Sequence, residues 1–111
     1  FDKDRLKQII INLLMNAKDA MNGKGEIVIK LEENENYAIL SIKDNGCGIK
    51  ESDQDKIFEP FFTTKPSGQG SGLGLAIVKR LVESMEGKIE FTTEVNKGTT
   101  FTIFLKRPTN Q

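Results

Sequence analysis

Residues 68–79 read GQGSGLGLAIVK, with four glycines in seven residues followed at once by an apolar run. Each glycine inside a helix costs about 1 kcal/mol relative to alanine, so this density indicates an unusual backbone conformation or a close approach to another group. The spacing fits neither the GxxxxGK[ST] phosphate loop nor the GxGxxG dinucleotide loop. It predicts a glycine-rich loop that leads into a helix N-terminus, where free N–H groups favour an anion. A flexible linker ahead of a helix is the alternative.

Two stretches have the spacing of an amphipathic helix, with apolar residues at three- and four-residue steps. The first runs from Asp4 to Met21, with Asp2 placed to act as its N-cap and Asn22–Gly23 suited to a left-handed C-terminal cap. The second runs from Leu73 to Met85, and we expect Gly87 to be its C-cap. The glycine-rich loop therefore leads directly into the second helix.

Four stretches alternate in the manner of half-buried strands, at residues 26–32, 37–43, 88–95 and 99–106. The short polar segments ENEN and NKG predict that these strands form two β-hairpins. The polar stretch after DNGCGI, residues 50–72, predicts a long loop with at most a short helical turn, of a length usually found in functional lids or disordered segments. The order helix, strand, strand, lid, helix, strand, strand predicts a two-layer α/β sandwich with a mostly antiparallel sheet.

Composition limits the possible functions. The 111 residues predict a single domain, and 16 Lys and Arg balance 16 Asp and Glu, so no net field draws this domain to nucleic acid or an anionic membrane. Cys47 is the single cysteine, which excludes an internal disulfide and fits a reducing compartment; we assign it no role. No apolar run approaches the ~20 residues of a membrane span.

Two features that the sequence lacks are more informative than its overall composition and charge. The chain contains no histidine, so a reaction that needs an imidazole must use one from another domain or protein. The chain also starts at Phe1 rather than at a methionine, and we therefore expect residues 1–111 to be a piece of a longer protein.

Asn12 and Asn16 stand four residues apart in the first predicted helix and so share one face. At about 100° per residue, Asn16 lies at the margin of the apolar stripe, beside the core and at the wall of any cavity. Its amide oxygen is a hard ligand of the kind that Mg²⁺ prefers when the ion bridges substrate phosphates. Two ordinary asparagines on a polar helix face are the alternative.

The sequence DNGCGI at residues 44–49 follows the second predicted strand. Asp44 could accept a hydrogen bond from an exocyclic amine, and Gly46 and Gly48 would let a flat ring lie against the backbone without a Cβ clash. A type I′ turn at Asn45–Gly46 is the alternative, although the next residues do not resume a strand.

The order of these blocks is more specific than any one of them. Five blocks resemble, in order, the N, G1, F, G2 and G3 boxes of the catalytic ATP-binding domain of sensor histidine kinases: NLLMNA, DNGCGI, FEPFFTTK, GSGLGLAIVK and KGTTF. The resemblance covers residues 2–106. The sequences of the F and G2 boxes are most similar to those of the short-lid, nitrogen-regulation type. It implies the Bergerat-type α/β sandwich, with ATP between the helical layer and the lid.

The resemblance also implies a role for each matching residue. The predicted catalytic residues are Asn16, which would bind Mg²⁺, Asn12, which would line the phosphate side, and two candidate phosphate cations, Lys18 and Lys65. Asp44 would bond the adenine amine, with Thr99 supporting adenine through Asp44 or a water. The predicted nucleotide-binding residues are Asp44, Gly46, Gly48, Ile49, Phe58, Gly70, Ser71, Gly72, Leu73, Gly74, Leu75 and Thr99.

Phe58, Phe61 and Phe62 allow two interpretations. In the family that the chain resembles, the F box anchors the lid and helps it dock on the helical domain that presents the histidine. The alternative is that at least one of these phenylalanines is an ordinary core residue.

The implied function is that of a protein-histidine kinase catalytic domain. It would bind ATP and Mg²⁺ in the cytoplasm and phosphorylate a histidine on a helical-hairpin domain, with a response regulator as indirect partner and without contact to nucleic acid or membrane. In ATPase and serine-kinase relatives, a glutamate four residues before the metal asparagine acts as base, and here Asn12, whose amide cannot accept a proton, holds that position. A non-catalytic ATP-binding switch, or a serine kinase or ATPase of this fold, is the alternative.

Overall fold

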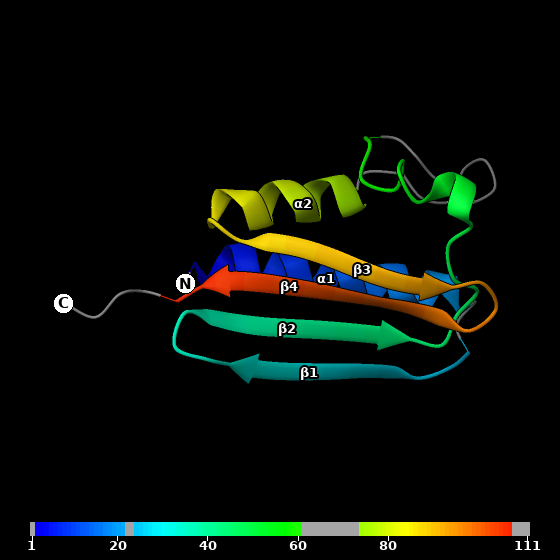
Figure 1. Cartoon of the computed structure of the whole chain (residues 1–111), viewed down its shortest axis with the longest axis horizontal. Helices are drawn as coiled ribbons and strands as arrows, with labels where there is room; N and C mark the ends of the chain where they lie inside the picture. Colours follow the sequence, from blue (N-terminus) through cyan, green and yellow to red (C-terminus); the bar gives the residue numbers. More distant parts are fainter. Residues whose placement is uncertain (1, 22–23, 61–73, 108–111) are drawn as a thin grey trace.

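The computed structural model describes residues 2–21, 24–60 and 74–107. Figure 1 shows one antiparallel sheet with two helices on the same side of it. The elements are α1 (Lys3–Ala20), β1 (Ile27–Glu33), β2 (Tyr37–Asp44), a 3₁₀ turn (Glu51–Asp53), α2 (Gly74–Ser84), β3 (Lys88–Glu94) and β4 (Gly98–Lys106). Every predicted helix and strand is confirmed in type and order, as is the two-layer α/β sandwich. Neither helix is long and apolar enough to cross a membrane within this described part of the chain.

The sheet has the strand order β1-β2-β4-β3, and every neighbouring pair is antiparallel. β4 is the most regular strand, because every second side chain from Thr99 to Leu105 is buried and the others are partly exposed. Its buried face points to the helical layer. The alternation of apolar and polar residues that predicted these strands is therefore explained by a sheet that is covered by helices on one face.

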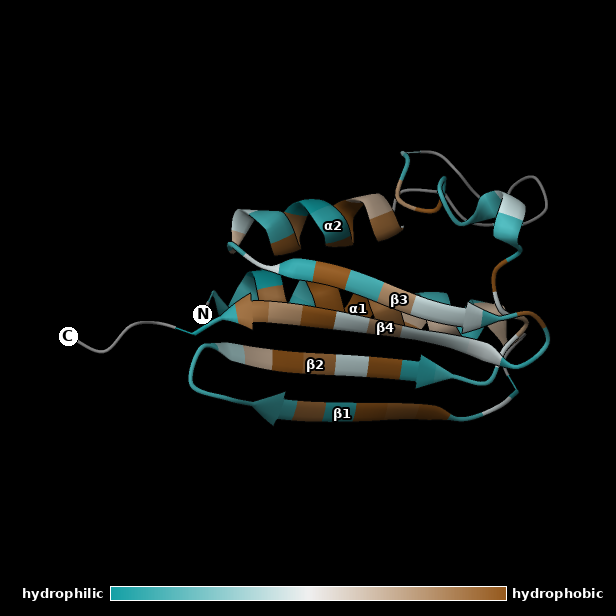
Figure 2. Cartoon of the chain, in the orientation of Figure 1, coloured by the Kyte–Doolittle hydropathy of each residue, from teal (hydrophilic) through white to brown (hydrophobic). Residues whose placement is uncertain are grey.

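The core lies between this sheet face and the two helices. Ile9 and Leu13 of α1 and Val78 and Val82 of α2 have almost no exposed surface. Figure 2 shows hydrophobic residues, in brown, recurring along both helices and along the strands of the sheet. Burying each such side chain stabilises the fold by about 1.5–3 kcal/mol. The sheet side of the core consists of Leu40, Ile42, Phe101, Ile103 and Leu105, and Ile57 joins it from the loop.

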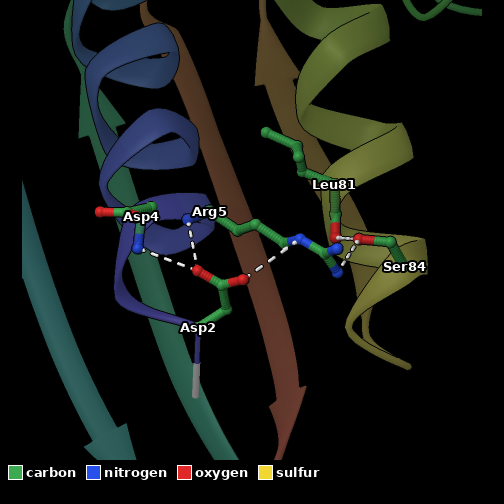
Figure 3. Close-up of polar contacts among 5 residues, drawn as sticks. All are labelled: Asp2, Asp4, Arg5, Leu81 and Ser84. Carbon is green, nitrogen blue, oxygen red and sulfur yellow. Dashed lines mark hydrogen bonds and ion pairs between the residues drawn. The ribbon is translucent and has the colours of Figure 1, made fainter.

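α1 begins where the sequence predicts, and its first turn is tied to the end of α2. Asp2 is the N-cap, and its carboxylate accepts from the backbone N–H groups of Asp4 and Arg5. Arg5 Nη1 donates to Ser84 Oγ over 3.1 Å, and Ser84 Oγ donates to the Leu81 carbonyl, as Figure 3 shows. Since the start of α1 contacts the end of α2, the two helices run antiparallel.

β1 is less buried than its alternation predicts. It is an edge strand that pairs with β2. Ile27 is partly covered, but the other six residues are exposed, including Ile29 at 53% and Leu31 at 72%. Helix α1 packs chiefly against β2 and makes as little contact with β1 as with β4, so most of this edge strand stays open on both faces.

The end of α2 corrects the predicted C-cap. The left-handed residue is Glu86, with φ of 57°, rather than Gly87. Gly87 N–H donates to the Val82 carbonyl and Glu86 N–H to the Glu83 carbonyl, the hydrogen-bond pattern of a Schellman motif. A Cβ on Gly87 would lie 2.5 Å from the Phe104 carbonyl oxygen, so Gly87 is needed for packing against β4. The predicted C-cap of α1, Asn22–Gly23, lies outside the described residues.

Replacing Glu86 by glycine should therefore stabilise the domain by about 0.5–1 kcal/mol. The left-handed conformation costs a side-chain-bearing residue ~1–2 kcal/mol, and the greater entropy of glycine in the unfolded chain offsets part of that gain. Thermal unfolding should show a midpoint a few degrees higher. Glu83→Gly is the matched control, because Glu83 is helical and its replacement should destabilise the domain by up to about 1 kcal/mol. Equal effects of both variants would contradict this explanation.

Candidate functional site

A buried carboxylate lies at the end of β2. Asp44 is 2% exposed and stands opposite Thr99, which is 5% exposed, in the β2–β4 register. Thr99 Oγ1 lies 2.8 Å from Thr93 Oγ1, which also accepts from the Ile49 N–H. Asp44 Oδ1 accepts from the Gly46 N–H over 2.9 Å. A carboxylate has about four acceptor positions, so Asp44 retains capacity to accept from a bound ligand.

The loop after Asp44 is held on two sides by its own backbone. Cys47 N–H donates to the Ala20 carbonyl at the end of α1, and the Cys47 carbonyl accepts from Asn96 N–H in the β3–β4 turn. Neither Asn45 nor Gly46 has a positive φ, which excludes the type I′ turn that DNG alone favours. The exposed Cys47 side chain has no part in these backbone contacts.

Gly46 and Gly48 are required by the packing of the chain itself. A Cβ on Gly46 would lie 2.6 Å from the Ala20 carbonyl oxygen. Gly48 has a φ of 74°, and a Cβ there would collide with the Glu94 carbonyl. Both glycines thus let the loop approach neighbouring backbone, and their predicted contact with a flat ring stays a prediction.

Arg5 shows which flank of α1 faces α2. At about 100° per residue, Arg5, Asn12 and Asn16 lie within roughly 40° of one another around α1. Since Arg5 reaches the end of α2 and the helices are antiparallel, helix geometry predicts that Asn12 and Asn16 face successively earlier turns of α2. At 1.5 Å per residue, Asn16 comes roughly level with Gly74, the first residue of α2.

Lys18 does not share this flank. It is exposed and lies about 160° around α1 from Asn16 by helix geometry. The phosphate contact predicted for Lys18 is therefore the least supported by the fold, and it stays a prediction.

Asn12 carries an unsatisfied polar atom. Its Oδ1 accepts from Gln8 Nε2 over 3.3 Å, whereas its Nδ2 is buried and has no hydrogen-bond partner in the described structure. Leaving a buried donor unpaired costs about 1–3 kcal/mol. Such an atom in a folded protein calls for an explanation, of which a ligand is one.

Phe58 is half-buried and packs against the core. Its ring packs edge-on against Phe91 and Phe101, with centroid distances of 6.0 and 6.4 Å. Lys79 Nζ lies 5.3 Å from the centroid of the same ring. These contacts favour the core interpretation for Phe58, and its contact with nucleotide stays a prediction.

Several predicted site residues lie outside the described residues. Gly74 and Leu75 are described, and they form the first turn of α2, with Leu75 packed against the core. Among the described residues, a Cβ on Gly74 would meet nothing within 4 Å, so their packing does not require a glycine at this position. The predicted residues for which the structure gives no account are Lys65, Gly70, Ser71, Gly72 and Leu73, together with Phe61 and Phe62 of the F box.

No cluster of metal-binding acids accompanies these residues. In residues 2–21, 24–60 and 74–107, no three His, Cys, Asp or Glu side chains lie close enough to hold a metal ion. A metal bound by the Asn16 amide would take its remaining ligands from elsewhere.

The hydrogen bond to Glu90, which raises the pKa of Lys88, lies on an exposed part of β3 away from this end of the sheet.

Two residues near the predicted set were not anticipated. Thr93 links Ile49 to Thr99, and no spacing in the sequence predicts that link. Gln8 bonds Asn12, and its position four residues earlier on the same helix is a signal that could have found it.

The chain is similar to known proteins over nearly its whole length. Residues 1–109 match the family described as "Histidine kinase-, DNA gyrase B-, and HSP90-like ATPase". The signal transduction histidine-protein kinase AtoS of Escherichia coli K12 is 44% identical over 105 residues, which are 94% of this chain and 17% of AtoS. The chain thus spans less than a fifth of that relative.

Solved structures agree with this likeness. The mycobacterial sensor histidine kinase MprB superimposes with a TM-score of 0.83 at 32% identity, over 98% of this chain and 77% of that one. Full-length ShkA in complex with AMPPNP superimposes with a TM-score of 0.82 at 31% identity, over 94% of this chain and 22% of ShkA.

Proposed function

The chain belongs to the family of histidine kinase-, DNA gyrase B- and HSP90-like ATPases, and we propose that it binds Mg²⁺-ATP and donates the γ-phosphoryl group to a histidine on a separate domain. The observation that carries this proposal is the buried Asp44 carboxylate opposite Thr99, close to the helix that carries two asparagines. A buried carboxylate with free acceptor positions suits the exocyclic amine of adenine. Amide groups beside the start of α2 suit phosphates and a hard metal ion.

The proposal gives a role to each of these residues. Asp44 accepts from the adenine amine, and the Thr93–Thr99 pair holds the neighbouring strands in register. Asn12 donates from Nδ2 to a phosphate oxygen, and Asn16 supplies an amide oxygen to Mg²⁺. Mg²⁺, when bound, would neutralise phosphate charge. Positioning and charge stabilisation account for most of the catalysis of phosphoryl transfer, so a site without an acidic cluster is adequate.

The acceptor in this proposal is an imidazole rather than water. Asn12 and Gln8 both carry amide side chains, which cannot accept a proton. General-base activation of water by this part of α1 is therefore disfavoured. An imidazole is already nucleophilic and needs less help. Since the chain has no histidine, the acceptor must come from another domain, which we propose to be a helical hairpin of the same full-length protein.

The wider setting is part of the same proposal. The relatives are named as sensor kinases, so we place the domain in a two-component pathway with a response regulator as indirect partner. ATP as substrate favours a cytoplasmic site of action. The short-lid, nitrogen-regulation subtype also remains a proposal.

A radiolabel assay tests the acceptor. With γ-labelled ATP, this chain alone should incorporate almost no label, and label should appear on a histidine-bearing helical-hairpin domain when that domain is added. The same domain with its histidine replaced by glutamine is the control and should stay unlabelled. Incorporation on serine or threonine of this chain would overturn the histidine proposal, and ATP binding without transfer to any histidine domain would favour the non-catalytic switch.

A further inference from the structure

The hydroxyl of Thr93 ties the loop that follows β2 to the other side of the sheet. Ile49 N–H donates to Thr93 Oγ1 over 2.9 Å. The same oxygen lies 2.8 Å from Thr99 Oγ1 and donates to the Gly98 carbonyl over 3.2 Å. A backbone N–H can only donate, so Thr93 Oγ1 is the acceptor for Ile49 whichever hydroxyl donates in the pair with Thr99.

Thr93 also belongs to a row of polar side chains that crosses three strands. Thr93 of β3 stands opposite Thr99 of β4, and Thr99 stands opposite Asp44 of β2. Two residues along the same strands, the same face of the sheet is apolar, with Phe91 opposite Phe101 against the core. The polar row therefore lies at the boundary between the core and the end of the sheet where Asp44 can accept from a ligand.

Ile49 is held on both sides of its peptide backbone. Thr93 accepts from its N–H, and its carbonyl accepts from Gln54 Nε2 over 3.2 Å. Its side chain packs against the core. Threonine is branched at Cβ, which restricts the rotation of its side chain, so β3 sets the place of the hydroxyl that holds Ile49.

We propose that Thr93 is a positioning residue for recognition of the adenine base. Its hydroxyl holds Ile49 and Thr99 at the places from which they would line the base beside the buried carboxylate. The inference rests on the proposed function, since it assumes adenine at this end of the sheet. Thr93 itself need not touch the nucleotide. Because its contacts are on the base side, its loss should weaken the binding of any adenine nucleotide and leave the transfer step unchanged.

Three substitutions in β3 separate the hydroxyl from the rest of the side chain. Thr93→Val keeps the branched shape and removes the acceptor for Ile49 N–H, and valine is well suited to a strand. Thr93→Ser keeps the hydroxyl and removes a methyl group. Thr92→Val is the matched control, because Thr92 is the preceding residue and its exposed side chain is on the opposite face of the sheet.

Nucleotide affinity is measured by calorimetric titration with ATP and with ADP, each with Mg²⁺. Thr93→Val should weaken the binding of both nucleotides by about five- to twentyfold, on the scale of one hydrogen bond. Thr93→Ser and Thr92→Val should stay within about threefold of the wild type, because neither removes the acceptor. Single-turnover transfer by Thr93→Val at saturating ATP should also stay within about threefold, since only ground-state binding is lost.

Several results would overturn the proposal. Wild-type ATP affinity in folded Thr93→Val would show that the hydroxyl serves stability alone. Equal losses in Thr93→Val and Thr93→Ser would show that the shape of the side chain matters and not its hydroxyl. A loss for ATP that far exceeds the loss for ADP would place the effect on the phosphate side. If valine prevents folding, Thr93→Ala removes the same hydroxyl and should give the same loss.

Amide hydrogen exchange in the nucleotide-free protein tests the link to the loop by itself. The Ile49 amide should exchange at least about threefold faster in Thr93→Val than in the wild type, because it has lost its acceptor. The Cys47 amide, which donates to the Ala20 carbonyl, should keep its rate. An unchanged rate at Ile49 would overturn the inference. If the wild type fails to bind ATP while the Ile49 rate rises, the proposed function fails and the link between Thr93 and the loop stands.

Discussion

Replacing Asp44 by asparagine is expected to weaken ATP binding ten- to hundredfold. Asp44 is almost fully buried, and its carboxylate is the acceptor available to an exocyclic amine at the end of β2. An asparagine amide would set a donor against the donor of adenine, and one unpaired buried group costs ~1–3 kcal/mol. Calorimetric titration of the purified variant measures the change.

The choice of base separates recognition from general damage at Asp44. Inosine triphosphate carries an oxygen where adenine carries the amine, and the asparagine amide can donate to that oxygen. Asp44→Asn should therefore reduce the preference for ATP over inosine triphosphate. Asp55→Asn, at an exposed position of the same loop, is the control and should leave both affinities unchanged. Near-wild-type ATP affinity in Asp44→Asn would refute the role of Asp44.

Replacing Asn16 by alanine should lower phosphoryl transfer to the histidine domain by at least about hundredfold. Asn16 offers the amide oxygen proposed for Mg²⁺, and no acidic cluster in the described residues could substitute for it. Removing one group that stabilises transition-state charge typically costs ~10²–10³ in rate. Single-turnover transfer at saturating ATP measures the chemical step, and we expect nucleotide affinity to fall less than this rate.

Two further variants identify the cause of such a loss. Asn16→Asp keeps an oxygen ligand and should retain more transfer than Asn16→Ala, with a different dependence on Mg²⁺ concentration. Asn36→Ala, in the exposed β1–β2 turn, should transfer phosphate at the wild-type rate. Transfer by Asn16→Ala within threefold of wild type would show that another group holds the metal.

The sequence was sufficient to predict the elements because each has a strong local signal. The three- and four-residue spacing of α1, the Asp2 cap and the period of two in β4 all depend on neighbours in the chain. The adjacency of Asp44 and Thr99 followed from the family resemblance, and the β2–β4 register is the long-range contact that confirms their proximity.

What the sequence did not predict depends on three-dimensional packing. The exposure of β1 depends on where α1 lies across the sheet, and alternation alone does not report that. Glu86 takes the left-handed position, and Gly87 is needed one residue later for close packing against Phe104. The burial of Asn12 Nδ2 without a partner depends on the packing around α1, which no spacing rule specifies.

The β2–β4 pairing also has a consequence for how the domain folds. β1 with β2 and β3 with β4 are hairpins between chain neighbours, and in the described sheet only β2–β4 joins the early part of the chain to the late part. Closing that long loop is the slow, entropically costly step. Asp44 and Thr99 lie opposite each other in the β2–β4 pair, so a ligand bound to both strands there would slow the separation of the two hairpins.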